Sequence, residues 1–211
     1  MKIAIFGATG GTGSQLVTQA LDRGDEVVAL ARQPQAVRVS HPRLRVEQGD
    51  VLSPDSVMTV VDGVDAVLSA LGIGYRRHAT TVYSVGVANV LAAMVRSNVR
   101  RLLVVSTSSL TLPAREEFAE WLLARYVLHP ALKRPYADMA LMEDQVLGSD
   151  RDWTLVRAAR LTNGGRTGTY RTRVDGKLSG CWSISRADLA EYLLDHILDT
   201  DSHRTTVEIA Y

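Results

Sequence analysis

Short runs of apolar residues alternate along the chain with stretches in which apolar residues recur every three or four positions. The first apolar run, residues 2–6, is typical of a strand that is buried on both faces. Residues 11–23 then place their apolar side chains on one helical face, and Gly24 stands where such a helix would end. Because a second apolar run follows at residues 26–31, the start of the chain predicts a strand–helix–strand unit.

This alternation continues to the end of the chain. Ser53 and Pro54 mark the start of another helix, as an N-cap residue followed by a first-turn proline. Strands that alternate with helices predict a parallel sheet covered on both faces, so we expect a doubly wound α/β fold. Further strands are expected at residues 44–48, 65–69, 101–106, 152–157 and 205–210, and further helices near residues 78–97, 116–128, 135–147 and 187–198.

Length and composition fit one ordinary globular domain. The 211 residues correspond to one domain with at most a small appendage, and no repeat or linker divides them. Hydrophobic residues make up 46% and charged residues 22%, which is not the profile of a disordered chain. We expect residues 1–211 to form a single domain in which residues 158–185 cap the substrate side of the sheet.

The charge balance and the cysteine count narrow the classes of partner. The 24 basic and 23 acidic side chains give a net charge of +1, which disfavours nucleic acid or an anionic membrane surface as a partner. Cys181 is the only cysteine, and the five histidines show no zinc-ligand spacing, so no metal site is expected. The N-terminus lacks a signal-peptide layout, and no apolar run approaches the roughly 20 residues that span a bilayer. We therefore expect a cytoplasmic protein.

The most informative local motif is the glycine-rich sequence GATGGTG at residues 7–13. It lies between a predicted strand and a predicted helix, where glycines allow a tight turn and let the backbone approach a diphosphate at the positive helix end. This position in a strand–helix–strand series is typical of a dinucleotide site, and a merely connecting turn is the alternative. The expected cofactor contacts are Gly7, Thr9, Gly10, Gly11, Thr12 and Gly13.

The end of the second strand indicates which dinucleotide is preferred. An NAD site places a carboxylate there for the ribose hydroxyls, whereas an NADP site places a cation there for the 2′-phosphate. This chain has Arg32, so we expect NADP(H) to be preferred over NAD(H). Arg38 is a weaker second candidate, and a solvated arginine at the strand end is the alternative. Asp50 and Val51 end the third strand where the adenine would lie.

Several motifs together resemble one family. These are KIAIFGATGGTG, the strand end at Arg32, the GDV turn, VVSTSS, and WSISRADLAEYLL near the C-terminus. The chain resembles the atypical short-chain dehydrogenases that bind NAD(P), in particular the group of biliverdin-IXβ reductase or flavin reductase and its NmrA-like relatives. The resemblance covers essentially the whole length. It implies a Rossmann-type domain, monomeric with a dimer as the alternative, that uses NADPH to reduce flavins, linear tetrapyrroles or other conjugated acceptors.

The tyrosines separate this chain from ordinary short-chain dehydrogenases, which use a tyrosine four residues before a lysine. None of Tyr75, Tyr83, Tyr126, Tyr136, Tyr170 and Tyr192 has a lysine at that distance. A tyrosine with a pKa near 10 needs a neighbouring cation to act near neutral pH, so simple carbonyl reduction is disfavoured. Hydride transfer to a conjugated ring is less demanding, because the charge spreads over the acceptor and solvent can supply the proton.

The same resemblance assigns residues near the nicotinamide. Ser108 aligns with a serine of biliverdin-IXβ reductase and is the candidate catalytic residue, with Ser106 as the second choice. Both belong to the hydroxyl-rich end of the fifth strand, at the sheet edge where ligands of such folds bind. A turn or capping serine is an equally simple reading of either position. Thr107 of the same cluster, together with Leu71 and Gly72 after the fourth strand, is expected to border the cofactor.

The loop after residue 157 departs from the family pattern. The reductase group can show Pro-Pro-His there, whereas this chain has Ala-Ala-Arg ending at Arg160, which argues against tetrapyrrole reduction. Arg160, Arg77 and Tyr136 are the candidate substrate contacts, and solvated side chains are the alternative. We expect an NADPH-dependent reductase of a flavin, quinone or similar acceptor. An NmrA-like sensor that binds NAD(P) without turnover is the alternative, while a nucleotide-sugar epimerase is disfavoured because the tyrosine–lysine pair is missing.

Overall fold

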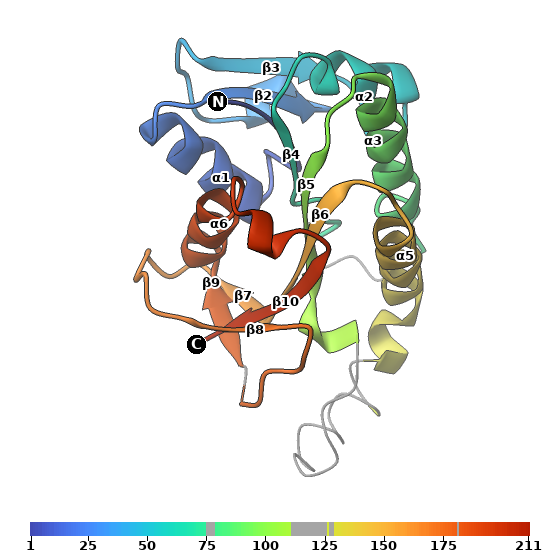
Figure 1. Cartoon of the computed structure of the whole chain (residues 1–211), viewed down its shortest axis with the longest axis vertical. Helices are drawn as coiled ribbons and strands as arrows, with labels where there is room; N and C mark the ends of the chain where they lie inside the picture. Colours follow the sequence, from blue (N-terminus) through green and yellow to red (C-terminus); the bar gives the residue numbers. More distant parts are fainter. Residues whose placement is uncertain (75–78, 111–125, 127–128, 181) are drawn as a thin grey trace.

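An eight-stranded sheet runs through the molecule, with helices on both of its faces (Figure 1). The computed structural model describes residues 1–74, 79–110, 126, 129–180 and 182–211. In this part of the chain the strand order is β3-β2-β1-β4-β5-β6-β10-β8, and all neighbours are parallel except β8 and β10. The strands are β1 (Lys2–Phe6), β2 (Glu26–Ala31), β3 (Leu44–Gln48), β4 (Ala66–Ser69), β5 (Arg101–Thr107), β6 (Asp152–Ala158), β8 (Arg171–Val174) and β10 (Thr205–Ala210).

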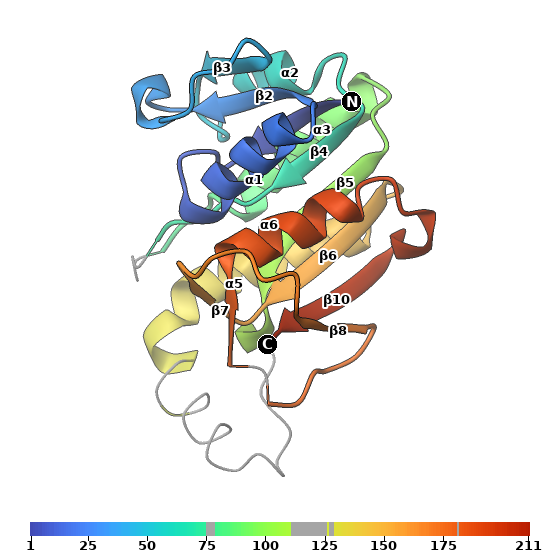
Figure 2. The ribbon, with the colours of Figure 1, turned by 90° about the vertical axis from the view of Figure 1, so that its left-hand side faces the viewer.

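Helices cover the two faces unequally (Figure 2). One face carries α1 (Gly11–Asp22) and α6 (Arg186–Asp195), and the other carries α2 (Pro54–Val61), α3 (Ser84–Arg96) and α5 (His129–Leu147). Each layer has its own apolar core, because the side chains of a strand alternate between the two faces of a sheet. Parallel strands buried on both sides are therefore nearly continuous apolar runs. The expected doubly wound α/β fold is confirmed.

The chain reverses its direction of travel across the sheet at β1. From β1 it proceeds outward to β2 and β3, then returns to β4 on the other side of β1 and continues to β5 and β6. The carboxyl ends of β1 and β4 consequently lie where the connections diverge, and such a switch point leaves a crevice above the sheet. This topology places the glycine-rich loop at the crevice.

The segment expected as a cap, residues 158–185, contains three short strands. Two of them, β7 (Arg160–Thr162) and β9 (Ser183–Ser185), pair in parallel as a separate two-stranded sheet. The third strand, β8, instead joins the main sheet antiparallel to β10. All four residues of β8 are exposed, as is usual for a short edge strand. The segment therefore both extends the sheet and contributes to the layer next to the crevice.

The largest differences from the predicted helices are at the starts of α3 and α5. The helix expected from residue 78 begins at Ser84, and the helix expected from residue 135 begins at His129 with Pro135 inside it. Proline is most common in the first turn of a helix, so the pattern pointed to a start at Pro135. Packing of α5 on α3 outweighs that local preference. The helix expected near residues 116–128 lies outside the described residues except for Tyr126.

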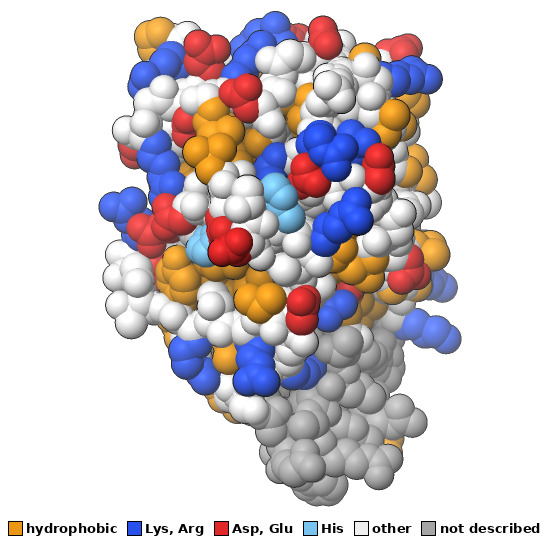
Figure 3. Space-filling model, in the orientation of Figure 1, with side chains coloured by type: hydrophobic (Ala, Val, Ile, Leu, Met, Phe, Trp, Pro, Cys, Tyr) orange, Lys and Arg blue, Asp and Glu red, His pale blue; other side chains and the backbone are white. Residues whose placement is uncertain are grey.

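The visible surface carries mixed charge (Figure 3). Basic and acidic side chains are interspersed over most of this face, and basic side chains gather over β8, where Arg171 and Arg173 are exposed. The guanidinium of Arg171 donates to the carbonyl oxygens of Ser179, Gly180 and Tyr211. Arg171 therefore holds the cap segment against the C-terminus.

Candidate cofactor site

A groove of about 710 Å³ lies at the carboxyl edge of the sheet, over the ends of β1, β2, β3, β4 and β5. Of the residues that the sequence indicated as cofactor contacts, all except Gly13 line it. They are Gly7, Thr9, Gly10, Gly11, Thr12, Arg32, Asp50, Val51, Leu71, Gly72, Ser106 and Thr107. These residues lie at the ends of five strands, β1 to β5, which are far apart in the sequence, and the parallel sheet brings them to one edge.

The glycine-rich loop is packed so tightly that two of its glycines have no room for a side chain. Gly7 has φ +86°, and a Cβ there would lie 2.3 Å from the carbonyl oxygen of Ala70 after β4. A Cβ at Gly13 would lie 2.0 Å from the carbonyl oxygen of Gly7 itself. Gly13 thus lies behind the loop and allows α1 to begin directly against it. The amide of Gly10 donates to the Gly7 carbonyl at 2.9 Å and closes the turn.

The N-terminus of α1 has no side-chain cap in the described part of the chain, in contrast to the N-termini of α2, α3 and α6. In α2 and α6 the hydroxyls of Ser53 and Ser185 accept a hydrogen bond from a first-turn amide. In α3 the carboxylate of Asp138 accepts from two backbone amides. Helix α1 begins after Gly10, and within the described residues no side chain caps it and no acidic residue lies in its first turn. Its amides and positive dipole end therefore face the groove, as in anion-binding helices.

The end of the groove over β2 and β3 carries one cation and one carboxylate. Arg32 follows β2, is exposed, and forms no ion pair within the described part of the chain. The Oδ1 atom of Asp50 accepts from the amide of Leu52 at 3.0 Å, which shapes the turn after β3. The carbonyl of Val51 accepts from Nδ2 of Asn89 at 2.9 Å, which joins that turn to α3. Arg32 is thus available to an anionic group, while the turn is held from behind.

Behind the end of β5 lies a buried ion pair. The hydroxyl of Ser106 donates to Oε1 of Glu143 at 2.6 Å, and Nε of Arg157 donates to the same oxygen at 3.1 Å. Glu143 lies on α5 and is 6% exposed, and Arg157 lies on β6. Glu143 raises the pKa of Arg157, first through this hydrogen bond and then through its charge. The pair locks α5 to the sheet and fixes the Ser106 side chain in the groove wall.

The hydroxyl-bearing residues after Ser106 extend from the end of β5 towards α5. Ser108, the candidate catalytic residue, begins the 3₁₀ turn Ser108–Leu110 that follows β5. The hydroxyls of Thr107 and Ser109 lie 2.7 Å apart, and Tyr136 on α5 donates to Ser109 Oγ at 2.9 Å. Burial raises the pKa of Tyr136, while the hydrogen bond to Ser109 opposes that shift. A chain of hydroxyls thus leads from Thr107 in the groove wall to α5.

The candidate substrate residues are not brought together. Arg160 is exposed at the start of β7, and its neighbour Leu161 lines the groove instead. Successive side chains of a strand point in opposite directions, so these two neighbours lie on opposite sides of β7. Arg77 lies outside the described residues. Tyr136 lies on α5, and its hydroxyl donates to Ser109, whose hydroxyl lies 2.7 Å from that of Thr107 in the groove wall.

Among the groove residues that the sequence did not assign are a tyrosine and an arginine. Tyr83, which is 6% exposed, lines the groove, and its hydroxyl accepts from the amide of Ile73 at 3.3 Å. Burial raises the pKa of Tyr83. Arg186, at the start of α6, lines the groove beside the glycine-rich loop. Its signal in the sequence is an arginine directly after the helix-capping Ser185, where the helix dipole disfavours a cation.

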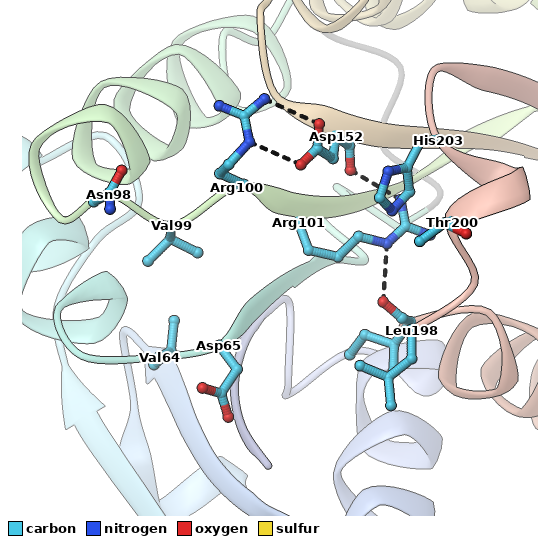
Figure 4. Close-up of a pocket in the computed structure, with 11 residues that line it drawn as sticks. Val64, Asp65, Asn98, Val99, Arg100, Arg101, Asp152, Leu198, Thr200 and His203 are labelled. Carbon is cyan, nitrogen blue, oxygen red and sulfur yellow. Dashed lines mark hydrogen bonds and ion pairs between the residues drawn. The ribbon is translucent and has the colours of Figure 1, made fainter.

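A second hollow, of about 460 Å³, lies at the opposite edge of the sheet (Figure 4). Its two arginines bind groups of the protein itself. Nε of Arg100 donates to Asp152 at 2.9 Å, and Arg101 donates to the carbonyl oxygens of Asp152 and Ile197. Burial lowers the pKa of Arg101 to about 10. These contacts join β5, β6 and the segment before β10, so they serve the fold.

The described residues contain neither a metal-binding cluster nor a membrane-spanning helix. No cluster of three or more histidine, cysteine, aspartate or glutamate side chains is arranged to hold a metal ion. Among the same residues, no helix combines the length and the apolar character needed to span a membrane.

Comparison with known proteins identifies the family. A family model described as NAD(P)H-binding matches residues 7–200, which include the glycine-rich loop and Arg186. The chain belongs to this NAD(P)H-binding family. The resemblance to NAD(P)-binding relatives of the short-chain dehydrogenases is thereby confirmed.

One curated relative is similar to about half of this NAD(P)H-binding chain. The 3 beta-hydroxysteroid dehydrogenase/Delta 5-->4-isomerase of Mycobacterium tuberculosis is 31% identical over 122 residues, which are 53% of this chain and 33% of the relative. This chain spans about a third of the length of the first curated relatives that it matches.

Solved structures share the fold of the whole chain. A short-chain dehydrogenase/reductase from Veillonella parvula in complex with NADP has a TM-score of 0.80 and 19% identity, and the match covers 100% of this chain and 94% of that one. ChuY, an anaerobillin reductase from Escherichia coli O157:H7, has a TM-score of 0.81 and 18% identity, with 100% and 97% covered. At these identities the comparison shows the fold.

Proposed function

We propose that this protein is an NADPH-dependent oxidoreductase that transfers hydride to a flavin or another conjugated small molecule. The observation that carries the proposal is that one end of the groove is suited to phosphate groups and the other end is mainly apolar. One end offers the uncapped amides of α1 and the cation Arg32, and the other end is mainly apolar beside Ser106 and Thr107. An extended dinucleotide needs the first end for its phosphates and the second for its nicotinamide ring.

The glycine-rich loop and the β2 end suit a phosphorylated dinucleotide. The amides of Gly11 and Thr12, at the start of α1, would donate to the diphosphate, since no side chain of the described residues caps this helix. Arg32 would contact the 2′-phosphate with a charge-assisted hydrogen bond. Asp50 and Val51 would border the adenine. A reduced nicotinamide bound in this direction supplies a hydride, that is one proton and two electrons.

The apolar end suits a flat, conjugated acceptor. Ile73, Val82, Met139 and Leu161 line it, and they come from the loop before α3, from α5 and from β7. Such a surface favours a ring system held by apolar contact over a small polar alcohol or ketone. After hydride transfer the negative charge spreads over the acceptor, and water can supply the proton, so the missing tyrosine–lysine pair is not required. Ser108 is proposed to position the nicotinamide.

The alternative is an NmrA-like binding protein that senses the redox state of NADP(H) without turnover. A specific observation favours it: two hydroxyls that line the groove are held by the protein. Ser106 donates to Glu143, and Tyr83 accepts from the amide of Ile73, so both act in the groove wall. A sensor needs only this fixed wall. Turnover decides between the two functions, because only the reductase consumes NADPH.

Titration of nicotinamide fluorescence tests the cofactor preference. We expect the wild-type protein to bind NADPH more tightly than NADH. Arg32→Ala should weaken NADPH binding about tenfold to a hundredfold and leave NADH binding nearly unchanged, because only the 2′-phosphate is affected. Arg96→Ala is the matched control, since Arg96 is an exposed arginine of α3 outside the groove lining. Equal wild-type affinity for the two cofactors would remove the role of Arg32.

Turnover is tested with a panel of flavins and quinones, followed by the loss of reduced-nicotinamide absorbance. Steady NADPH oxidation would eliminate the sensor, and tight binding without oxidation would support it. Ser108→Ala should lower kcat more than it changes the affinity for NADPH, because positioning contributes mainly to the reacting geometry. Unchanged turnover in this variant would end the role of Ser108.

A further inference from the structure

One side chain from the C-terminal part of the chain lies directly over the glycine-rich loop. Arg186 begins α6, is partly buried, and lines the groove. A Cβ placed on Gly11 would lie 2.6 Å from Cδ and 2.7 Å from Nε of Arg186. The side chain of Arg186 therefore crosses the first residue of α1. Gly11 has an ordinary φ, so a side chain at residue 11 would require only that the Arg186 side chain move.

The direction of the guanidinium is fixed by a neutral partner. Nη1 of Arg186 donates to Oδ1 of Asn163 at 2.7 Å. Asn163 follows β7 in the segment that borders the groove through Leu161. Two elements of the cap thus hold the cation beside the loop, and Asn163 positions it without neutralising its charge.

No carboxylate within the described residues pairs with Arg186. The nearest acidic residue in the sequence, Asp188, is fully buried and already accepts from the amides of Thr167 and Gly168 and from the hydroxyls of Ser185 and Tyr211. The dipole of α6 also disfavours a cation in its first turn. The dipole of α6 therefore does not stabilise the charge of Arg186, and this charge adds to the positive end of α1.

We infer that Arg186 is a diphosphate-binding residue, which completes the cofactor site from the side opposite to the α1 amides. This inference rests on the proposed function, since it requires a dinucleotide in the groove. The amides at Gly11 and Thr12 contact the diphosphate from below, and the guanidinium of Arg186 contacts it from above. A planar guanidinium can bond two phosphate oxygens at once. Arg32 and Arg186 thereby have separate tasks, since Arg32 reads the 2′-phosphate and Arg186 holds the group that NADPH and NADH share.

This division of tasks gives the test. Dissociation constants of NADPH and NADH are measured by nicotinamide fluorescence for the wild type, Arg186→Gln, Arg186→Lys and Arg32→Ala. We expect Arg186→Gln to weaken both cofactors by the same factor, about tenfold to a hundredfold, with Arg186→Lys in between. Arg32→Ala should weaken NADPH alone. ADP and AMP serve as further probes, and Arg186→Gln should weaken ADP more than AMP because AMP lacks the diphosphate.

The outcomes separate the two proposals. If the wild type binds NADPH but oxidises none with any acceptor, the reductase fails while the binding constants still test Arg186. If Arg186→Gln binds both cofactors like the wild type, or loses NADPH alone, the inference is overturned. A wild type that binds neither cofactor overturns both. Thermal unfolding of each variant checks the fold, and Asn163→Ala gives a second measurement, because loss of the positioning partner should weaken NADPH and NADH equally but less than Arg186→Gln.

Discussion

At the scale of single residues, the shape of the candidate cofactor site depends on glycines, which have no Cβ atom. Gly7 and Gly13 each face a backbone carbonyl at a distance that excludes a Cβ, so the loop can only be built from glycine at these two positions. Gly72 lines the same groove, yet nothing lies within 4 Å of the place where its Cβ would be. Glycine is thus a steric requirement at the first two positions and not at Gly72.

Gly13→Ala is therefore expected to destabilise the protein by about 1–3 kcal/mol. We expect a value near the upper end of this range, because the backbone oxygen of Gly7 cannot rotate away from the new Cβ. Alanine normally favours a helix over glycine by about 1 kcal/mol, so helix propensity alone predicts the opposite sign. Urea unfolding measures the change. Gly72→Ala is the matched control and should change the unfolding free energy by less than about 0.5 kcal/mol. A more stable Gly13→Ala protein would contradict this packing of the loop.

At the scale of secondary-structure elements, the groove wall is held by contacts between helices. Asp138 of α5 is 5% exposed, and its carboxylate accepts from the amides of Tyr83 and Ser84 at 3.0 and 3.3 Å and from the Ser84 hydroxyl. The start of α3 is thus capped by another helix instead of by a residue of its own sequence. This is why α3 begins at Ser84, later than the periodicity predicted.

Asp138→Ala is expected to cost about 2–3 kcal/mol, because two buried amides lose their acceptor. Ser53→Ala is the comparison, since Ser53 accepts a single amide of α2 at 3.4 Å, and its loss should cost about 0.5–1 kcal/mol. Denaturant unfolding of both variants measures the difference. Equal costs would mean that Asp138 does not cap α3. Asp138→Asn should fall between the two, since the amide oxygen still accepts.

At the scale of the whole molecule, the C-terminal part of the chain packs against the N-terminal part through α6 and α1. Helix α6 packs beside α1, where Nε2 of Gln19 donates to the carbonyl of Ala187 at 2.9 Å. Tyr192 of α6 is 4% exposed in the same core, and its ring stacks on His196 with 4.0 Å between centroids. Burial is the main reason why the pKa of Tyr192 is raised to about 12, with the charge interaction with Tyr170 second.

This shift makes global stability depend on alkaline pH. Because the folded-state pKa lies above the ordinary value of 10.0, the neutral form of Tyr192 is favoured in the folded protein. Its contribution is complete below about pH 10 and is lost as the pH rises towards about 12. We expect the unfolding free energy to fall across this window, and to fall less in Tyr192→Phe. Urea unfolding at a series of pH values measures both slopes, and identical slopes would contradict the assignment.

The sequence alone determined the architecture and one half of the cofactor site. Local patterns identify strands and helices, and parallel strands bring their carboxyl ends to one edge, so the glycine-rich loop, Arg32, Asp50 and Ser106 could be assigned to a common groove without coordinates. These positions follow directly from strand ends, which the apolar pattern marks.

The other half of the site was decided only by the tertiary structure. Arg186 lies over Gly11, Asp138 caps α3, Leu161 takes the place expected for Arg160, and β8 runs antiparallel at the sheet edge. Each of these arrangements joins segments that are distant in the sequence, and no local pattern specifies which distant residues meet. Their positions depend on how helices and short strands pack on the finished sheet, and that packing exists only once the chain is folded.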